Sequence, residues 1–289
     1  MRQRPHGRRR GEGEHESELV PRLRSVVPLH RFGYEGIRGF GRQVLEALAV
    51  ATPHARHVAL TIHGAGYGLD ENEAFVSEVA GIMDAINSGA FPLGLQKVTI
   101  VEANPGRAQR LAALLANLRP DGPSASPDRQ VPPLQALPDR FRSVGYGSHG
   151  KPRAFVAMPF AEEMDDIFHY GIQGAVNAAG CLCERADAST FTGDVADWVM
   201  ERVASASLVI ADLSEANPNV YLEVGYAWGR GRPTVLLVSD ASQLKFDVRG
   251  QRCLVYNRSI KRLEASLRAE LEGLRTSLDE SWSRAPDSR

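Results

Sequence analysis

Two carboxylates, Glu223 and Asp212, have positions from which they could do chemistry. Glu223 is the acidic residue within "NPNVYLEVGYAWG", an otherwise largely apolar stretch that predicts a helix, and Asp212 ends the apolar run before it. A carboxylate at the edge of a buried helix face is partly desolvated, which raises its basicity and suits nucleophilic or acid–base chemistry. Spacing alone leaves an alternative, in which Glu223 is a solvated flank residue and Asp212 caps the following turn.

The predicted helix begins with Asn217 as its N-cap and Pro218 in its first turn, so its positive dipole end favours an anionic or strongly polar ligand. Asn219 and Tyr226 lie four residues before and three after Glu223, where they could hydrogen-bond to its carboxylate. At about 100° per residue, Glu223 falls at the edge of the face expected to lie on a sheet. That face comprises Val220, Val224, Ala227 and Trp228.

The segment that carries both carboxylates alternates strands with helices. Strands are predicted at 154–160, 182–187, 208–214, 233–239 and 252–257, and helices at 162–180, 193–206, 217–231 and from 259 to about 278. This pattern predicts an α/β domain with a doubly wound, flavodoxin-like parallel sheet. In the common strand order 2-1-3-4-5, the loops at 158–163 and 212–219 meet at a ligand-binding crevice, where the strand order reverses.

Three motifs in this segment resemble those of the nucleoside 2-deoxyribosyltransferase family. They are "AFVAMPF", "ASLVIADLS" and "NVYLEVGYAWGRGRPTVLL", and the likeness covers about residues 153 to 257. The resemblance implies that Glu223 is the nucleophile that attacks C1′ of a nucleoside and that Asp212 assists at the base or sugar. It also implies that Met158, Pro159 and Phe160 line the sugar pocket and that the site is completed in a homo-oligomer.

The sequence departs from that family in the loop before the helix, where "EANPNVYL" replaces the usual small residues. With this change, the substrate pocket could bind a different nucleoside or a nucleotide. A more distant resemblance to bacterial TIR-like domains, which use a helix glutamate to cleave NAD, points to the same reaction class. Leu222 and Tyr226, predicted to face away from the sheet, also favour a covering loop or a neighbouring subunit.

Three further polar residues are candidates for substrate contacts. Arg249 could bind a phosphate as a fork donor, or it could belong to a solvated loop. Asp187 and Asp194 bracket the loop after the second strand of the segment, where each could contact substrate or cap the next helix.

An α/β unit is predicted upstream, with helices at 37–51, 71–87 and 104–118 and strands at 57–64 and 96–103. Its first strand leads into "HGAGYGLD", a loop with Gly64, Gly66 and Gly68, which could bring backbone N–H groups to a phosphate or simply form a tight turn. The order of these elements resembles the second half of a macro domain over about 60 residues. We interpret His63 as a core histidine at the end of the strand.

The domain organisation follows from these elements and from composition. We expect a disordered tail at 1–25, a small macro-like α/β domain at 26–118, a linker rich in Pro and Gly at 119–151, the transferase-like domain at 152–280 and a disordered tail at 281–289. The arginines of the first tail could form a nucleic-acid-binding arm, but the glutamates between Glu12 and Glu18 offset them.

Bulk composition narrows the function classes. The formal net charge is −1, and no apolar run approaches the ~20 residues that span a bilayer, so neither nucleic acid nor a membrane is the expected partner. We expect a cytoplasmic protein without a cofactor or metal. The three cysteines are interpreted as buried thiols rather than a metal site, with Cys181 and Cys183 pointing the same way along a strand.

These observations give three hypotheses. The first is an enzyme that cleaves or transfers at the N-glycosidic bond of a nucleoside, nucleotide or NAD. The second is a module that senses a nucleotide or an ADP-ribose-like ligand in the same crevice without turnover. The third is a scaffold in which the last helix mediates assembly. Glu223 discriminates between the first two, because a pure sensor does not need it.

Overall fold

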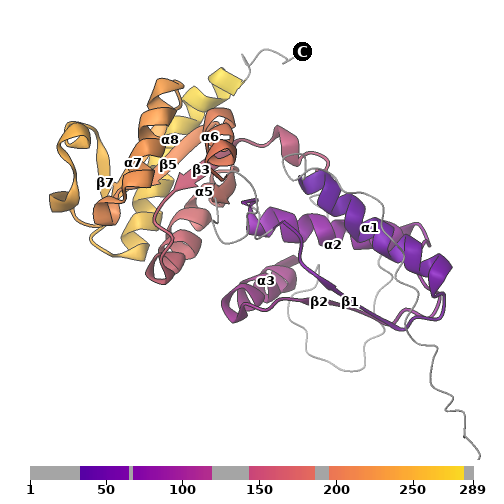
Figure 1. The fold of residues 1–289 in the computed structure, drawn as a ribbon. Helices are drawn as coiled ribbons and strands as arrows, with labels where there is room; N and C mark the ends of the chain where they lie inside the picture. Colours follow the sequence, from indigo (N-terminus) through magenta and orange to yellow (C-terminus); the bar gives the residue numbers. More distant parts are fainter. Residues whose placement is uncertain (1–32, 65–67, 119–142, 186–194, 283–289) are drawn as a thin grey trace, which may run out of the picture.

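The described residues of the computed structural model are 33–64, 68–118, 143–185 and 195–282 (Figure 1). The helices and strands predicted for both halves of the chain are present. The first half runs through α1 (Tyr34–Ala51), β1 (His57–Thr61), α2 (Glu71–Asn87), β2 (Lys97–Val101) and α3 (Pro105–Leu118). None of the described helices is long and apolar enough to cross a membrane.

Strands β1 and β2 form a two-stranded parallel sheet, in register from His57 with Lys97 to Thr61 with Val101. Helices α1 and α2 cover it, and their apolar residues share one core cluster with residues of both strands. The two helices pack closely at Gly41 and Gly81, where an added Cβ would overlap Glu78 O and Arg38 O of the facing helix. Glycine at these positions therefore sets the distance between α1 and α2.

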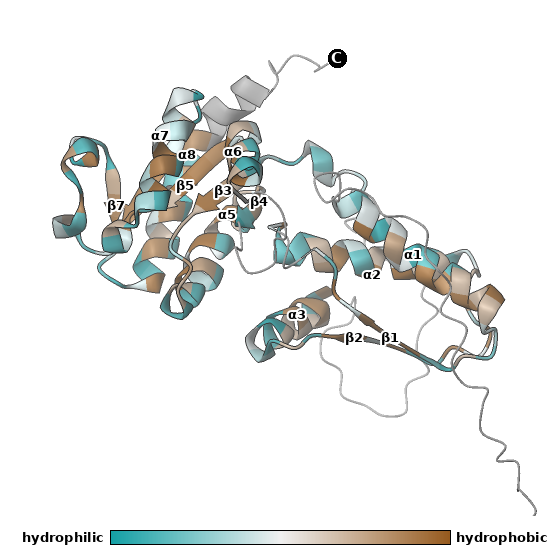
Figure 2. Ribbon diagram, in the orientation of Figure 1, coloured by the Kyte–Doolittle hydropathy of each residue, from teal (hydrophilic) through white to brown (hydrophobic). Residues whose placement is uncertain are grey.

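The second half contains a five-stranded parallel sheet, ordered β4-β3-β5-β6-β7, which is the order 2-1-3-4-5 considered from the sequence. Its strands are β3 (Arg153–Ala157), β4 (Leu182–Arg185), β5 (Leu208–Asp212), β6 (Thr234–Val238) and β7 (Cys253–Val255). Every residue of the central strand β5 is buried, as expected for a parallel strand covered on both faces. Figure 2 shows the central strands as a hydrophobic layer between helices with polar outer surfaces.

Helices lie on both faces of this sheet. One core cluster joins the sheet to η4 (Ile167–Gln173), α5 (Gly174–Ala178) and α8 (Ile260–Trp282), and it includes Cys181 and Cys183. The other joins it to α6 (Val195–Ser205) and α7 (Pro218–Gly229). Both cysteines point into one cluster, as the strand alternation predicted, and both are buried thiols that form no disulfide.

The structure differs from the sequence prediction at three places. The single helix expected at 162–180 is divided into η3 (Glu162–Met164), the π-helix η4 and α5. Trp228 was predicted on the sheet face but is 40% exposed, because Val220, Val224 and Ala227 already fill that face. Tyr226, expected to face away, packs partly buried against the core, whereas Leu222 is 61% exposed, as predicted.

The two halves are joined by hydrogen bonds around Asp70. Its Oδ1 accepts from Glu73 N at 2.9 Å and so caps α2. Its Oδ2 accepts from Asn177 Nδ2 at 2.7 Å and from Cys183 N at 2.8 Å. Burial raises the pKa of Asp70, while these hydrogen bonds favour its charged form.

The described end of the predicted linker also packs against α2. Ser148, in η2 (Ser148–Gly150), is buried and accepts from Gly145 N at 2.9 Å. Lys151 Nζ lies 2.7 Å from both carboxylate oxygens of Glu73. Residues 143–151 are therefore held to the first half of the chain.

Candidate functional site

The carboxyl ends of β3 and β5 lie side by side, which brings together the two loops singled out in the sequence. The two strands pair in parallel up to Ala157 with Ala211. Met158 and Pro159 follow β3 and are buried, whereas the next residue, Phe160, is 55% exposed. Parallel strands present their following loops at one edge, so these residues and Asp212 share the edge at which α/β sheets bind ligands.

The loop after β5 turns tightly into α7 at the same edge. Asn217 caps α7, as predicted, and its side chain accepts from Asn219 N at 2.9 Å. Before it, in η6 (Ser214–Ala216), Glu215 and Ala216 have φ values of 62° and 50°. Non-glycine residues rarely adopt this left-handed region, and such strain is typical of functional loops.

Asp212 is fully buried at the end of β5. Its Oδ1 accepts from Ser214 N and its Oδ2 from the Tyr256 hydroxyl, both at 2.9 Å. Ser214 Oγ lies 3.2 Å from that hydroxyl and accepts from Ser239 N at 2.8 Å. Burial raises the pKa of Asp212. Its contacts match the turn-capping alternative, because both of its oxygens hold neighbouring protein groups.

Glu223 is the most unusual titratable group at this edge. It is half-buried on α7, and desolvation raises the pKa of its carboxyl to about 7. Among the described residues, no hydrogen-bond donor or cation pairs with it. Asn219, which is exposed, and Tyr226 therefore do not form the hydrogen bonds expected from their spacing.

The side of α7 on which Glu223 lies follows from Tyr221. The Tyr221 hydroxyl accepts from Lys245 N at 3.3 Å, which places Tyr221 on the flank of α7 that faces the loop after β6. Two residues further on, a helix has turned by about 200°, so Glu223 projects from the opposite flank. That flank faces α6, which shares a core cluster with α7. Glu223 is therefore turned toward the β3 side of the sheet.

Arg249 lies on the other side of α7 from Glu223. It is exposed, and its Nη2 donates to Leu244 O at 3.2 Å. It borders a cavity of about 440 Å³ between the loops after β5 and β6, which include η7 (Ala241–Gln243) and η8 (Phe246–Val248). The structure does not bring Arg249 together with Glu223.

The remaining predicted residues are placed as follows. Asp187, Asp194 and Gly66 lie outside the described residues. Gly64 and Gly68 have positive φ values of 86° and 79°. An added Cβ at Gly64 would meet Ile37, and one at Gly68 would overlap the Trp198 ring. Backbone conformation and packing thus account for both glycines, as in the tight-turn alternative.

Three polar contacts were not identified from the sequence. Tyr256 follows β7 and reaches Asp212 across the sheet edge. His63, interpreted as a core histidine, is held by the buried Glu78, whose Oε2 accepts from His63 N at 2.9 Å and lies 3.3 Å from His63 Nδ1. Tyr34 donates to Glu184 at 3.1 Å. All are long-range contacts, and no local motif indicates them.

In the described part of the chain, no group of three or more His, Cys, Asp or Glu side chains could hold a metal ion. Comparison of the sequence with protein-family models gives no match. Comparison with curated proteins gives none either.

Proposed function

We propose that the C-terminal half of the chain cleaves or transfers at the N-glycosidic bond of a nucleoside, nucleotide or NAD, with Glu223 as the nucleophile. One observation carries the proposal: Glu223 is a half-buried carboxylate without a partner among the described residues, and its pKa is about 7. An unpaired carboxylate of raised basicity is well suited to attack an anomeric carbon. A structural glutamate in such a setting would instead be expected to have a partner.

The reaction would proceed in two steps. The Glu223 carboxylate attacks C1′ as the bond from C1′ to the base nitrogen breaks, and the base leaves with the bonding electron pair and takes up a proton. Water, or a second base in a transfer reaction, then displaces the carboxylate from C1′. Close to pH 7 about half of the Glu223 side chains carry the charge that the first step needs.

We assign Asp212 a positioning role in this scheme. Both of its oxygens accept hydrogen bonds, from Ser214 N and from Tyr256, so it holds the loop before α7 rather than touching the substrate. Met158, Pro159 and Phe160 border the sugar from the neighbouring strand. The order of the sheet and the helices on both faces support the doubly wound, flavodoxin-like arrangement on which this placement depends.

A homo-oligomer is part of the proposal. Leu222 and Trp228 are 61% and 40% exposed on α7, which leaves apolar surface on the helix that carries Glu223. A second copy packed there would cover this surface close to the proposed site.

The experiment is a base-release assay on the full chain with a panel of nucleosides, nucleotides and NAD, read by mass spectrometry. Glu223→Gln keeps the shape of the side chain but removes the nucleophile, so base release should fall by about 100-fold or more. Glu272→Gln, on the exposed side of α8, is the matched control and should leave it unchanged. Undiminished release by Glu223→Gln would exclude this nucleophile, and an intact bound ligand after long incubation would favour the sensing module.

A further inference from the structure

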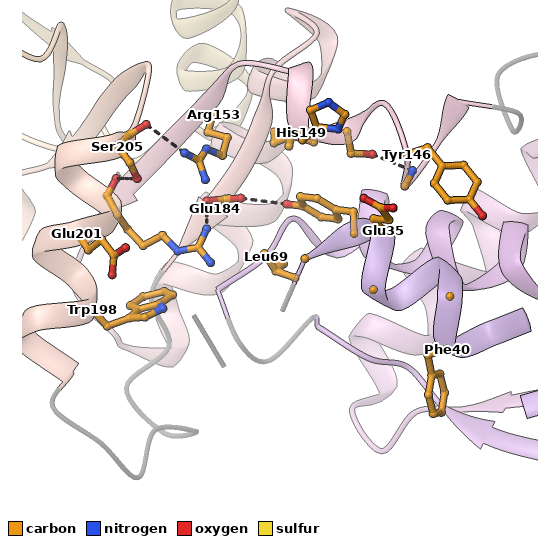
Figure 3. A pocket seen from close by; sticks show the side chains of 18 of the residues that line it. Glu35, Phe40, Leu69, Tyr146, His149, Arg153, Glu184, Trp198, Glu201 and Ser205 are labelled. Atoms are coloured by element: carbon orange, nitrogen blue, oxygen red, sulfur yellow. Dashed lines mark hydrogen bonds and ion pairs between the residues drawn. The ribbon is translucent and has the colours of Figure 1, made fainter. Parts of the chain in front are cut away.

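A second cavity lies at the opposite edge of the sheet from the proposed catalytic site. Its volume is about 900 Å³, and it is enclosed by α1, residues 145–149, the first residues of β3 and β4, and α6 (Figure 3). Arg153 and Leu182 begin β3 and β4 here, whereas Met158 follows the other end of β3 and Asp212 is the last residue of β5. The volume is in the range of small-molecule sites, and the inference from it is independent of the proposed function.

One wall of the cavity is built around a buried ion pair. Glu184 is 3% exposed, and its two oxygens accept from the Tyr34 hydroxyl at 3.1 Å and from Arg202 Nη1 at 2.9 Å. Arg153 donates from Nη2 to Ser205 O at 3.2 Å. The other N–H groups of these two arginines have no acceptor among the described residues. Two guanidinium groups on one wall thus retain donors suited to a phosphate.

The opposite wall is the first part of α1, where glycine recurs at Gly33, Gly36 and Gly39. Gly33 is the N-cap and provides no side-chain acceptor for the N–H groups of the first turn. An added Cβ would meet nothing within 4 Å at Gly33, and only Gln43 Nε2, at 3.9 Å, at Gly39. Packing within the described residues therefore does not require glycine at Gly33 or Gly39, and its absence of a side chain leaves the helix backbone there open to the cavity.

The other lining groups suit a planar ring that carries amino groups. Figure 3 shows Trp198 and Glu201 on one side of the cavity and Glu35 and Tyr146 on the other. Trp198 is 9% exposed, and the Arg202 guanidinium lies over its ring at 5.1 Å, so the indole adds a small, rigid apolar area to the wall beside the arginine. Glu35 and Glu201 are exposed and have no described partner, so they are available to accept N–H groups.

The charges at this cavity discriminate between ligand classes. Arg42, Arg153 and Arg202 are balanced in number by Glu35, Glu184 and Glu201. Glu184 is already paired with Tyr34 and Arg202, so a simple anion would use the arginines but leave the exposed carboxylates of Glu35 and Glu201 unpaired and repelling it. A ligand with a phosphate at one end and an amino-substituted aromatic ring at the other uses both sets. We propose that this cavity binds a purine nucleoside monophosphate, which bridges α1 and the wall formed by β3, β4 and α6.

The test is calorimetric titration of the full chain carrying Glu223→Gln, so that turnover does not consume the probe. The probes are AMP, GMP and inorganic phosphate. We expect at least one of the two nucleotides, AMP or GMP, to bind. Gly39→Leu, whose side chain would occupy the cavity, should weaken that binding by about 10-fold or more. Arg153→Gln should weaken it similarly. Gly273→Leu, on α8 with nothing within 4 Å, should bind like the parent.

Misfolding is not expected to explain a loss of binding. Leu is a better helix former than Gly, so Gly39→Leu should melt at the same temperature as its parent or higher. Failure of both nucleotides to bind, phosphate binding as tight as nucleotide binding, or binding unchanged by Gly39→Leu would each overturn the proposal. Absence of base release by the unmodified chain would count against the proposed glycosidic chemistry alone.

Discussion

The Tyr34 hydroxyl donates a hydrogen bond to Glu184 Oε1 at 3.1 Å, between residues 150 positions apart in the chain. The same hydroxyl accepts from Asp70 N at 2.9 Å. All three residues are buried, so one phenol oxygen satisfies a carboxylate of the C-terminal sheet and a backbone amide at the start of α2. Burial and the charge of Glu184 raise the pKa of Tyr34, which keeps the hydroxyl protonated as a donor.

Removing that hydroxyl should destabilise the protein. Tyr34→Phe leaves Glu184 Oε1 and Asp70 N buried without this partner, and we expect it to lower the free energy of unfolding by about 1–3 kcal/mol. Urea denaturation measures the change. Tyr221→Phe is the control, because its hydroxyl accepts a single long hydrogen bond, from Lys245 N at 3.3 Å near the surface. Equal losses in the two variants would show that the Tyr34 contacts are not formed in solution.

Local patterns predicted the frame of the proposed catalytic site well. Asn217 and Pro218 begin α7, alternating strands and helices gave the parallel sheet, and helical phase placed Glu223 at the edge of the buried face. Each of these features depends on residues close together in the sequence. The prediction that Trp228 lies on the sheet was wrong. Three smaller residues of α7 already fill the face that packs on the sheet, and Trp228 is partly exposed.

Contacts between distant segments could not be predicted in the same way. Tyr256 meets Asp212 only because β7 is the second strand away from β5 in the folded sheet. Tyr34 meets Glu184 only because the first half of the chain packs on β4 and α6. The spacing of residues around a single tyrosine or glutamate does not indicate a partner in a distant segment. Both sets of hydrogen bonds were therefore identified only in the structure.

The ionisation of Glu223 should cost stability at neutral and alkaline pH. Its folded pKa, about 7, lies above the ordinary value of 4.5, so the folded state binds the proton more tightly. Stability therefore falls as pH rises from about 4.5 to 7 and is constant above that. Glu223→Gln removes this penalty and should raise the free energy of unfolding at pH 8 by about 1–3 kcal/mol, less than the full change in pKa corresponds to because the side chain is only half-buried.

Paired denaturation of wild type and Glu223→Gln at pH 8 and pH 5 measures this effect. The advantage of the variant should shrink toward pH 5, where the protonated carboxyl and the amide are both neutral. A variant less stable than wild type at pH 8 would indicate that the carboxylate has a stabilising partner.

The proposed reaction should show the opposite dependence on pH. Attack on C1′ requires the ionised carboxylate, so kcat/KM should rise with pH, reach half its maximum near pH 7 and fall by about tenfold per unit well below that. Base release between pH 5 and 9 measures the profile, with Glu272→Gln as a control that should follow wild type. Activity that declines above pH 7 would mean that Glu223 acts as a protonated acid instead.

His169 should make the contact between α3 and η4 sensitive to acid. Its Nε2 lies 3.0 Å from Arg110 Nη2 and its Nδ1 lies 3.1 Å from Gln173 Oε1. Arginine can only donate and the amide oxygen can only accept, so the ring must be neutral with its proton on Nδ1. Arg110 is fixed in turn by Glu71, at 3.1 Å. Protonation of Nε2 would place two donors face to face and break this contact.

The sign of the effect follows from the lowered pKa of His169. Burial lowers it, and the charges of Arg110 and Arg185 add to this, while Gln173 and the charge of Glu71 act against it. The unfolded chain therefore takes up the proton first. The stabilisation is complete above the ordinary pKa of 6.5 and is lost as pH falls below it, by at most about 1.4 kcal/mol per pH unit for one proton.

Measuring this loss requires a background without Glu223, because its titration has the opposite sign over part of the same range. In Glu223→Gln, adding His169→Gln keeps an acceptor for Arg110 but removes the titration. We expect the free energy of unfolding to fall less steeply between pH 7 and 5 in the double variant than in the single one. Identical slopes would mean that His169 is not held neutral by Arg110. A steeper slope in the double variant would mean that the histidine is stabilised in its protonated form by Glu71.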